Sequence, residues 1–181
     1  MIISILALNG WNRSSIIKIS AAVTSVFLAF FICLLTMNHW KDQGLRYEEL
    51  NYLTRPYRSV FLSSVLIGTA GGTLDTVITV IATLEELTKR QPEITAKQLW
   101  LSGRQVGRDV IGSMTNILLF VYISGSVPSL LLYLGNQWSF KETIEQHLSL
   151  EFLRVIAGSL GIVLSIPISV LFFLTVRRLK R

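Results

Sequence analysis

The stretch that decides the fold is VIAGSLGIVLSIPISVLFFLTV, residues 155–176. It contains no charged residue, Arg154 precedes it, and a basic tail at residues 177–181 follows it. A helix needs about 20 mostly apolar residues to cross the hydrocarbon core of a bilayer. The stretch therefore predicts a membrane-spanning helix.

Three other stretches of the chain are long and apolar enough to cross, at residues 16–37, 60–84 and 110–134. With 155–176 they predict an all-α fold, a polytopic transmembrane helix bundle of four spans that forms a single transmembrane domain over residues 1–181. Residues 1–8 are also apolar, but at about 1.5 Å per residue they are too short to cross. They lack the basic start and the cleavage site of a signal peptide, so we expect an interfacial segment or the end of a preceding helix.

The composition excludes a soluble protein. Of the 181 residues, 51% are hydrophobic and 15% are charged, against roughly 25% charged residues in soluble domains. A short soluble chain could not bury so much apolar surface, and an apolar composition also excludes disorder. The single cysteine, Cys33, excludes an internal disulfide.

The net charge of +6 follows a topological pattern. Lys and Arg are more frequent at the N-terminal end, in the 85–109 connection and at the C-terminus than in the other connections. The positive-inside rule then places the 85–109 connection and the C-terminus in the cytoplasm. We therefore expect the lipid bilayer as a partner and no nucleic acid.

The connections between the spans carry signals of their own. Thr95 and Gln98 have the spacing of a capping box, which predicts that a helix begins there and runs into the third span. Residues 41–57 mix charges with Leu and Tyr, which favours a segment lying on the outer interface, and residues 135–150 are similar.

Asp75 is an acid inside the second span. Its neighbours at helical spacing are small or polar, namely Gly68, Gly71, Gly72 and Thr79. Ionisable residues in spans usually face a bundle interior or a water-filled cavity. This pattern favours a proton- or cation-responsive site, and the alternative is a protonated Asp75 hydrogen-bonded across a helix pair.

The third span has a polar face with Thr115 and Asn116, and Gly103, Gly107 and Gly112 precede or enter it. In an antiparallel hairpin Asp75 and Asn116 would lie at the same depth, so we predict a hydrogen bond between them.

The fourth span repeats the pattern on one helical face, with Arg154, Gly158, Gly161, Ser165 and Ser169. Small residues at such spacing let helix backbones approach closely, so tight packing alone is the alternative interpretation of each face. The predicted packing glycines are Gly68, Gly71, Gly72, Gly107, Gly112, Gly158 and Gly161. Together the three faces predict a polar interior around Asp75.

Arg104 and Arg108 lie one helical turn apart at the entry to the third span. They could bind a lipid headgroup or an anionic substrate, or they could serve as topogenic charges. Glu142, Glu145 and His147 match no known metal-ligand spacing, so we expect a solvated loop and no metal there.

Catalytic signatures are absent from the sequence. There is no Walker A motif, no HExxH motif and no cysteine pair. Neither histidine lies in a predicted span, which leaves an intramembrane Ser–His site without its base. We expect no enzyme activity and no cofactor, and an intramembrane lipid-modifying enzyme has the least support.

The chain resembles the YibE/F-like family of bacterial multi-pass membrane proteins. The segments that carry the resemblance are 10–13, 51–57, 67–75, 86–87, 102–104, 107–116, 124–128, 151–154 and 158–162. The resemblance implies a multi-pass protein of the bacterial plasma membrane and a possible transport component. Family members generally have more upstream helices, which implies that this chain is N-terminally short and that residues 1–8 end a preceding span.

These observations favour a transporter or permease component. A polar path would be lined by Asp75, Thr79, Thr115 and Asn116, with Arg104 and Arg108 at its cytoplasmic mouth. The alternative is a non-transporting scaffold or assembly subunit that pairs with another membrane protein. Either interpretation predicts a homo-oligomer or a second membrane subunit, and the sequence identifies no substrate or coupling ion.

Overall fold

The computed structural model describes residues 3, 5, 10–39 and 56–178. In this part of the chain four long helices are present: α2 (Arg13–His39), α3 (Tyr57–Arg90), α4 (Ala96–Gly135) and α6 (Ser149–Arg178). A short helix α5 (Phe140–Thr143) and a π-helical turn (Ile144–Leu148) lead from α4 into α6. Each long helix is apolar and long enough to cross a membrane, and each contains one of the predicted spans. The predicted all-α fold with four spans is confirmed.

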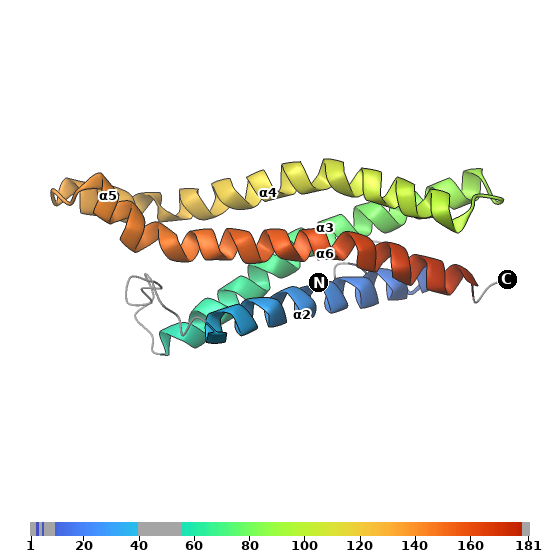
Figure 1. Cartoon of the computed structure of the whole chain (residues 1–181), viewed down its shortest axis with the longest axis horizontal. Helices are drawn as coiled ribbons and strands as arrows, with labels where there is room; N and C mark the ends of the chain where they lie inside the picture. Colours follow the sequence, from blue (N-terminus) through green and yellow to red (C-terminus); the bar gives the residue numbers. More distant parts are fainter. Residues whose placement is uncertain (1–2, 4, 6–9, 40–55, 179–181) are drawn as a thin grey trace.

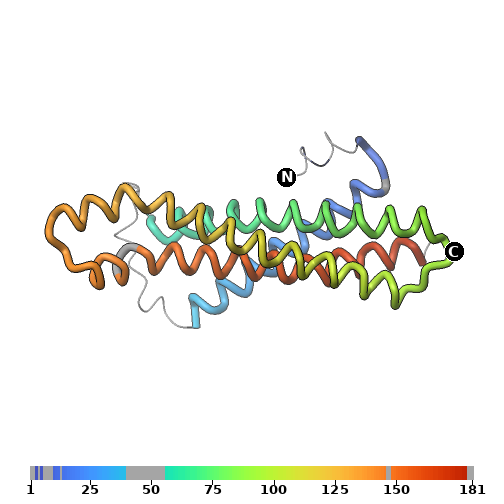
Figure 2. Tube along the Cα trace, turned by 90° about the horizontal axis from the view of Figure 1, so that it is seen from above, coloured from blue at the N-terminus to red at the C-terminus, as the bar shows by residue number. Residues whose placement is uncertain are grey.

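Helix α6 is the centre of the bundle. It packs against α2, α3 and α4. In Figure 1 α6 lies between α4 and α2, and α3 crosses behind α6 from the α2 side to the α4 side. Seen from above in Figure 2, α4 runs along α3 and α6. In the most apolar 18-residue segment of each helix, 50% of the residues are buried in α6 but only 6% in α4. Most of the α4 surface is therefore free to contact lipid or another protein.

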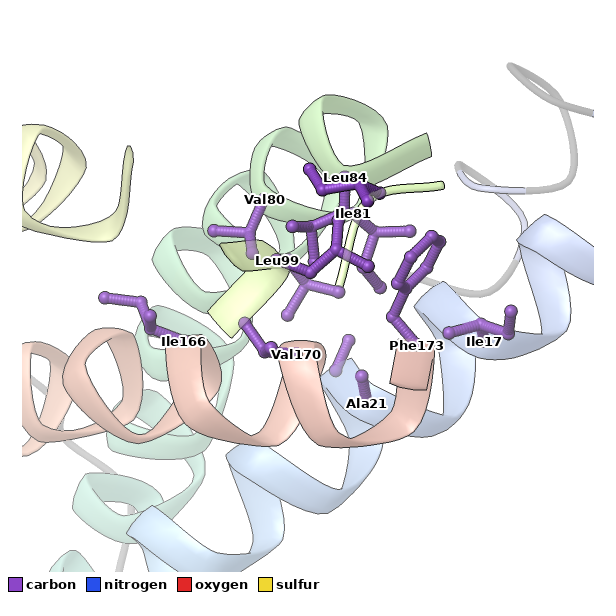
Figure 3. Close-up of a cluster of buried hydrophobic side chains, with 12 residues drawn as sticks. Ile17, Ala21, Val80, Ile81, Leu84, Leu99, Ile166, Val170 and Phe173 are labelled. Carbon is purple, nitrogen blue, oxygen red and sulfur yellow. The ribbon is translucent and has the colours of Figure 1, made fainter. Parts of the chain in front are cut away.

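The larger apolar core joins all four long helices near the end of the bundle that holds the C-terminus (Figure 3). Leu84 of α3, Leu99 of α4, and Val170 and Phe173 of α6 are buried there, and Ile17 of α2 completes the cluster. A second cluster, at the α5 end, is built around Phe61 and Val65 of α3 with Leu150 and Ala157 of α6. Because lipid is as apolar as these side chains, close packing holds the helices together.

The predicted capping box starts α4. The Thr95 hydroxyl accepts from the Gln98 backbone N–H at 3.3 Å, and the Gln98 side chain accepts from the Thr95 backbone N–H at 2.9 Å. From there α4 continues for 40 residues, about 60 Å at 1.5 Å per residue, which is twice the thickness of the hydrocarbon core. Pro128 and Pro167 lie inside the continuous helices α4 and α6.

Two predicted segments fall mainly outside the described residues. Of residues 41–57 only 56 and 57 are described, and of residues 1–8 only Ile3 and Ile5, which are both helical. The proposed interfacial position of the first segment and the interpretation of the second as part of a preceding helix stay predictions.

Candidate functional site

The face predicted on the fourth span is buried along its whole length. Arg154, Gly158, Gly161, Ser165 and Ser169 all lie inside the bundle, and we call this row the inner stripe. Three threonines of α3 line the opposite wall, spaced at i, i+4 and i+7: Thr69, Thr73 and Thr76. Sequence reasoning missed these threonines, although their spacing is that of one helical face.

Gly161 marks the point where three helices meet. A Cβ atom at this position would lie 2.5 Å from Cγ2 of Thr69, 2.8 Å from Oγ1 of Thr73 and 3.5 Å from Cβ of Ala29. These residues belong to α3 and α2, so the missing side chain is what lets both helices approach α6.

Four other predicted packing glycines also lie against a side chain of another helix. A Cβ atom would meet the Tyr122 hydroxyl at Gly68, Ile162 at Gly72, Ile166 at Gly107 and Leu118 at Gly158. Five of the seven glycines, these four and Gly161, therefore lie against a side chain of another helix. Gly71 and Gly112 have nothing within 4 Å of such an atom among the described residues, so no described side chain packs against these two.

Hydroxyl groups make up the polar interior of the bundle. Thr76 donates to the carbonyl of Gly72 at 2.9 Å, and Ser165 donates to that of Ile162 at 2.7 Å. The hydroxyls of Thr73 and Ser169 are inaccessible and have no hydrogen-bond partner in the described part of the chain. The interior is therefore polar, as predicted, but Asp75 is not part of it.

Charged pairs stand near both ends of this interior. At the α5 end Arg154 is 7% exposed. Its guanidinium donates to the carboxylate of Glu151 and, at 3.0 Å, to the Ser64 hydroxyl. It also lies 5.1 Å from the ring centroid of Phe61. At the other end Lys18 of α2 is 3.7 Å from Glu85 of α3. Each buried cation therefore has an acid beside it, which offsets the cost of burial.

Asp75 lies on the outside of the bundle. It belongs to a row of exposed residues at every fourth position of α3, which we call the outer stripe: Ser63, Ile67, Gly71, Asp75 and Thr79. The Thr79 hydroxyl donates to the backbone carbonyl of Asp75 at 2.8 Å. The Asp75 carboxyl itself has no hydrogen bond or ion pair with any described residue.

The predicted hydrogen bond between Asp75 and Asn116 does not form. Gly72 and Leu118 are neighbours, so Asp75 and Asn116 do lie at similar depth in an antiparallel pair, but both side chains are exposed. The physical reason is the orientation of α3: because Thr73 and Thr76 face α6 and Gly72 faces Leu118, Asp75 is turned away from the interior. Among the described residues, Asp75 therefore does not lie in the polar interior.

The predicted site residues of α4 differ in their exposure. Asn116 continues an exposed row at every fourth residue that includes Arg104, Arg108 and Gly112. Thr115 is half-buried, and its hydroxyl has no partner among the described residues.

Arg104 and Arg108 line a groove between α4 and α6 with a volume of about 370 Å³. The other lining residues are Trp100, Ile111, Val163, Ile166, Pro167 and Val170. Asp75, Thr79, Thr115 and Asn116 do not line it. The groove that both arginines line therefore includes none of the residues expected around Asp75.

Comparison with known proteins places the chain in a family. A family model described as YibE/F-like protein matches residues 1–178. The chain therefore belongs to the YibE/F-like family, in agreement with the resemblance seen in its motifs, and with its four apolar helices it is an integral, multi-pass membrane protein. No curated protein and no solved structure matches it significantly.

Proposed function

For this member of the YibE/F-like family we propose a role as one subunit of a membrane transporter, in which the outer stripe of α3 lines a polar path for protons or cations. One observation carries this proposal. Asp75 lies in the middle of a membrane-spanning helix, is exposed, and its carboxyl has no partner among the described residues.

An acid in this position is costly if it faces lipid. The cost of a charged group at the centre of a span is at least about 2.5–3.5 kcal/mol on insertion scales, and such groups mark ion and substrate pathways. The path is therefore expected to lie where the outer stripe meets a second copy of the chain or a second membrane subunit. Gly71 leaves room beside the carboxyl, and Thr79 adds a hydroxyl oxygen that can accept a hydrogen bond or contact a cation.

The test is transport by the full chain in vesicles. The protein is reconstituted, a pH gradient is imposed, and flux is followed with a pH-sensitive dye inside the vesicles. We expect flux to fall to the level of protein-free vesicles in Asp75→Asn and Asp75→Ala. Glu93→Gln is the control, because Glu93 is an exposed acid in the α3–α4 connection. Unchanged flux in both Asp75 variants would contradict the proposal, and no flux with the unmodified chain would contradict a path formed by copies of this chain alone.

A scaffold function is the second candidate, and one observation favours it. Gly71 and Gly112 have the character of packing glycines but touch nothing in the described chain, so a helix of another protein could approach there. In this case Gly71→Leu abolishes co-purification of the partner while Asp75→Asn retains it. Gly161→Leu does not test the scaffold, because Gly161 packs inside the bundle. Neither proposed role requires catalysis.

A further inference from the structure

We propose that the groove between α4 and α6 binds an anionic phospholipid, with its phosphate at Arg104 and Arg108 and one acyl chain along the apolar part of the groove. This inference does not depend on the transporter proposal, since Asp75 and its stripe take no part in it.

The basic end of the groove has an unsatisfied charge. Arg104 and Arg108 lie four residues apart on one helix, where two like charges repel each other. Both are exposed, and neither has an ion pair or hydrogen bond with a described residue. Lys18 and Arg90 of the same end, by contrast, have Glu85 and Glu86 as partners. An anion held between the two guanidinium groups would relieve this repulsion, and guanidinium is well suited to phosphate.

The position of the groove fits a headgroup. Trp100 is half-buried at the basic end, packed against the larger core, and indole rings favour the headgroup level of a bilayer. Ile166 touches the position of Gly107, and Val170 that of Gly103, so these α6 residues lie level with the two arginines. Ile111 and Val163 lie further along the groove toward the middle of the membrane.

The remaining wall suits a hydrocarbon chain. Ile111, Val163, Ile166, Pro167 and Val170 are apolar, and free phosphate would leave this surface without a partner. Basic pockets between transmembrane helices are a recurrent site for anionic lipid headgroups. The combination of two arginines that have no partner among the described residues with an adjoining apolar wall selects a lipid over a small soluble anion.

Lipid retention by the purified full chain tests this proposal. The protein is equilibrated with equal amounts of phosphatidylglycerol and phosphatidylcholine, and native mass spectrometry counts the lipids that remain bound. We expect phosphatidylglycerol to be retained at least tenfold over phosphatidylcholine, and Arg104→Gln/Arg108→Gln to lose this preference. The matched control is Lys89→Gln/Lys97→Gln, which removes two exposed charges from the same end without touching the groove.

Two further measurements separate the lipid from other anions. Val163→Trp fills the apolar wall while both arginines remain, and it should also lose bound phosphatidylglycerol. Millimolar inorganic phosphate should not displace the lipid from the unmodified chain. Equal retention of the two lipids, an equal loss in the lysine control, full retention in Val163→Trp, or displacement by phosphate would each overturn the proposal.

Discussion

Helix α3 carries small and hydroxyl-bearing residues on two faces, and the two faces have opposite surroundings. Thr73 and Thr76 point into the bundle, where Thr73 adjoins Gly161 of the inner stripe. Gly71, Asp75 and Thr79 of the outer stripe are exposed. The same residue types therefore build a helix contact on one side of α3 and an uncovered surface on the other.

The charged residues of the two stripes also differ in their surroundings. In the inner stripe Arg154 has Glu151, Ser64 and the Phe61 ring around it. In the outer stripe the Asp75 carboxyl has no partner among the described residues. Interactions of the inner stripe hold the helices of this chain together. The outer stripe is suited to an interaction with a second molecule. Substitutions should then affect folding at the inner stripe and assembly or transport at the outer one.

The largest difference is expected for the two charged residues. Arg154→Met leaves the half-buried Glu151 without its cation, and breaking a buried ion pair in this way costs up to about 3–5 kcal/mol. We expect the free energy of unfolding in detergent micelles to fall by that order. Asp75→Asn should leave it unchanged, because the carboxyl has no hydrogen bond or ion pair with a described residue to lose.

A second variant checks the cause of this loss. In Arg154→Met/Glu151→Gln the remaining acid is neutral, so part of the lost stability should return. Equal loss of stability in Arg154→Met and Asp75→Asn would show that the two charges do not differ as the structure indicates.

The sequence predicted the features that depend on local patterns. Apolar length located the four spans, the Thr95–Gln98 spacing located the start of α4, and the spacing from Arg154 to Ser169 identified a face that is buried as a unit. These signals need no knowledge of neighbouring helices.

The orientation of α3 could not be predicted in the same way. Gly71 and Gly72 are about 100° apart on the helix, both fit a packing role by residue type, and of the two only Gly72 has a neighbour among the described residues. With small and polar residues on both faces, the sequence offers no contrast that selects the inner one. The groove beside Arg104 was missed because half of its wall comes from α6.

A pair of glycine substitutions is the next test of the comparison. Leucine at Gly161 would collide with Thr69 and Thr73, and overpacking of this kind typically costs about 1–3 kcal/mol. Leucine at Gly71 meets open space in this chain, so its free energy of unfolding should stay close to that of the unmodified protein. Thermal unfolding of the two variants in the same detergent measures the difference. A comparable loss for Gly71→Leu would mean that the outer stripe is already covered within the monomer.

The smallest expected effects come from two buried threonines that differ in hydrogen bonding. The Thr73 hydroxyl has no partner among the described residues, whereas Thr76 donates to the Gly72 carbonyl. Valine has nearly the same shape as threonine, so Thr73→Val removes an unsatisfied polar group and should be neutral or stabilising by up to about 1 kcal/mol. Thr76→Val should cost no more than about 0.6 kcal/mol, the average for hydrogen bonds between helices in membrane proteins, because the Thr76 bond lies within α3. Because the two shifts have opposite sign, unfolding titrations run side by side can resolve them, and a larger loss for Thr73→Val would show that its hydroxyl does have a partner.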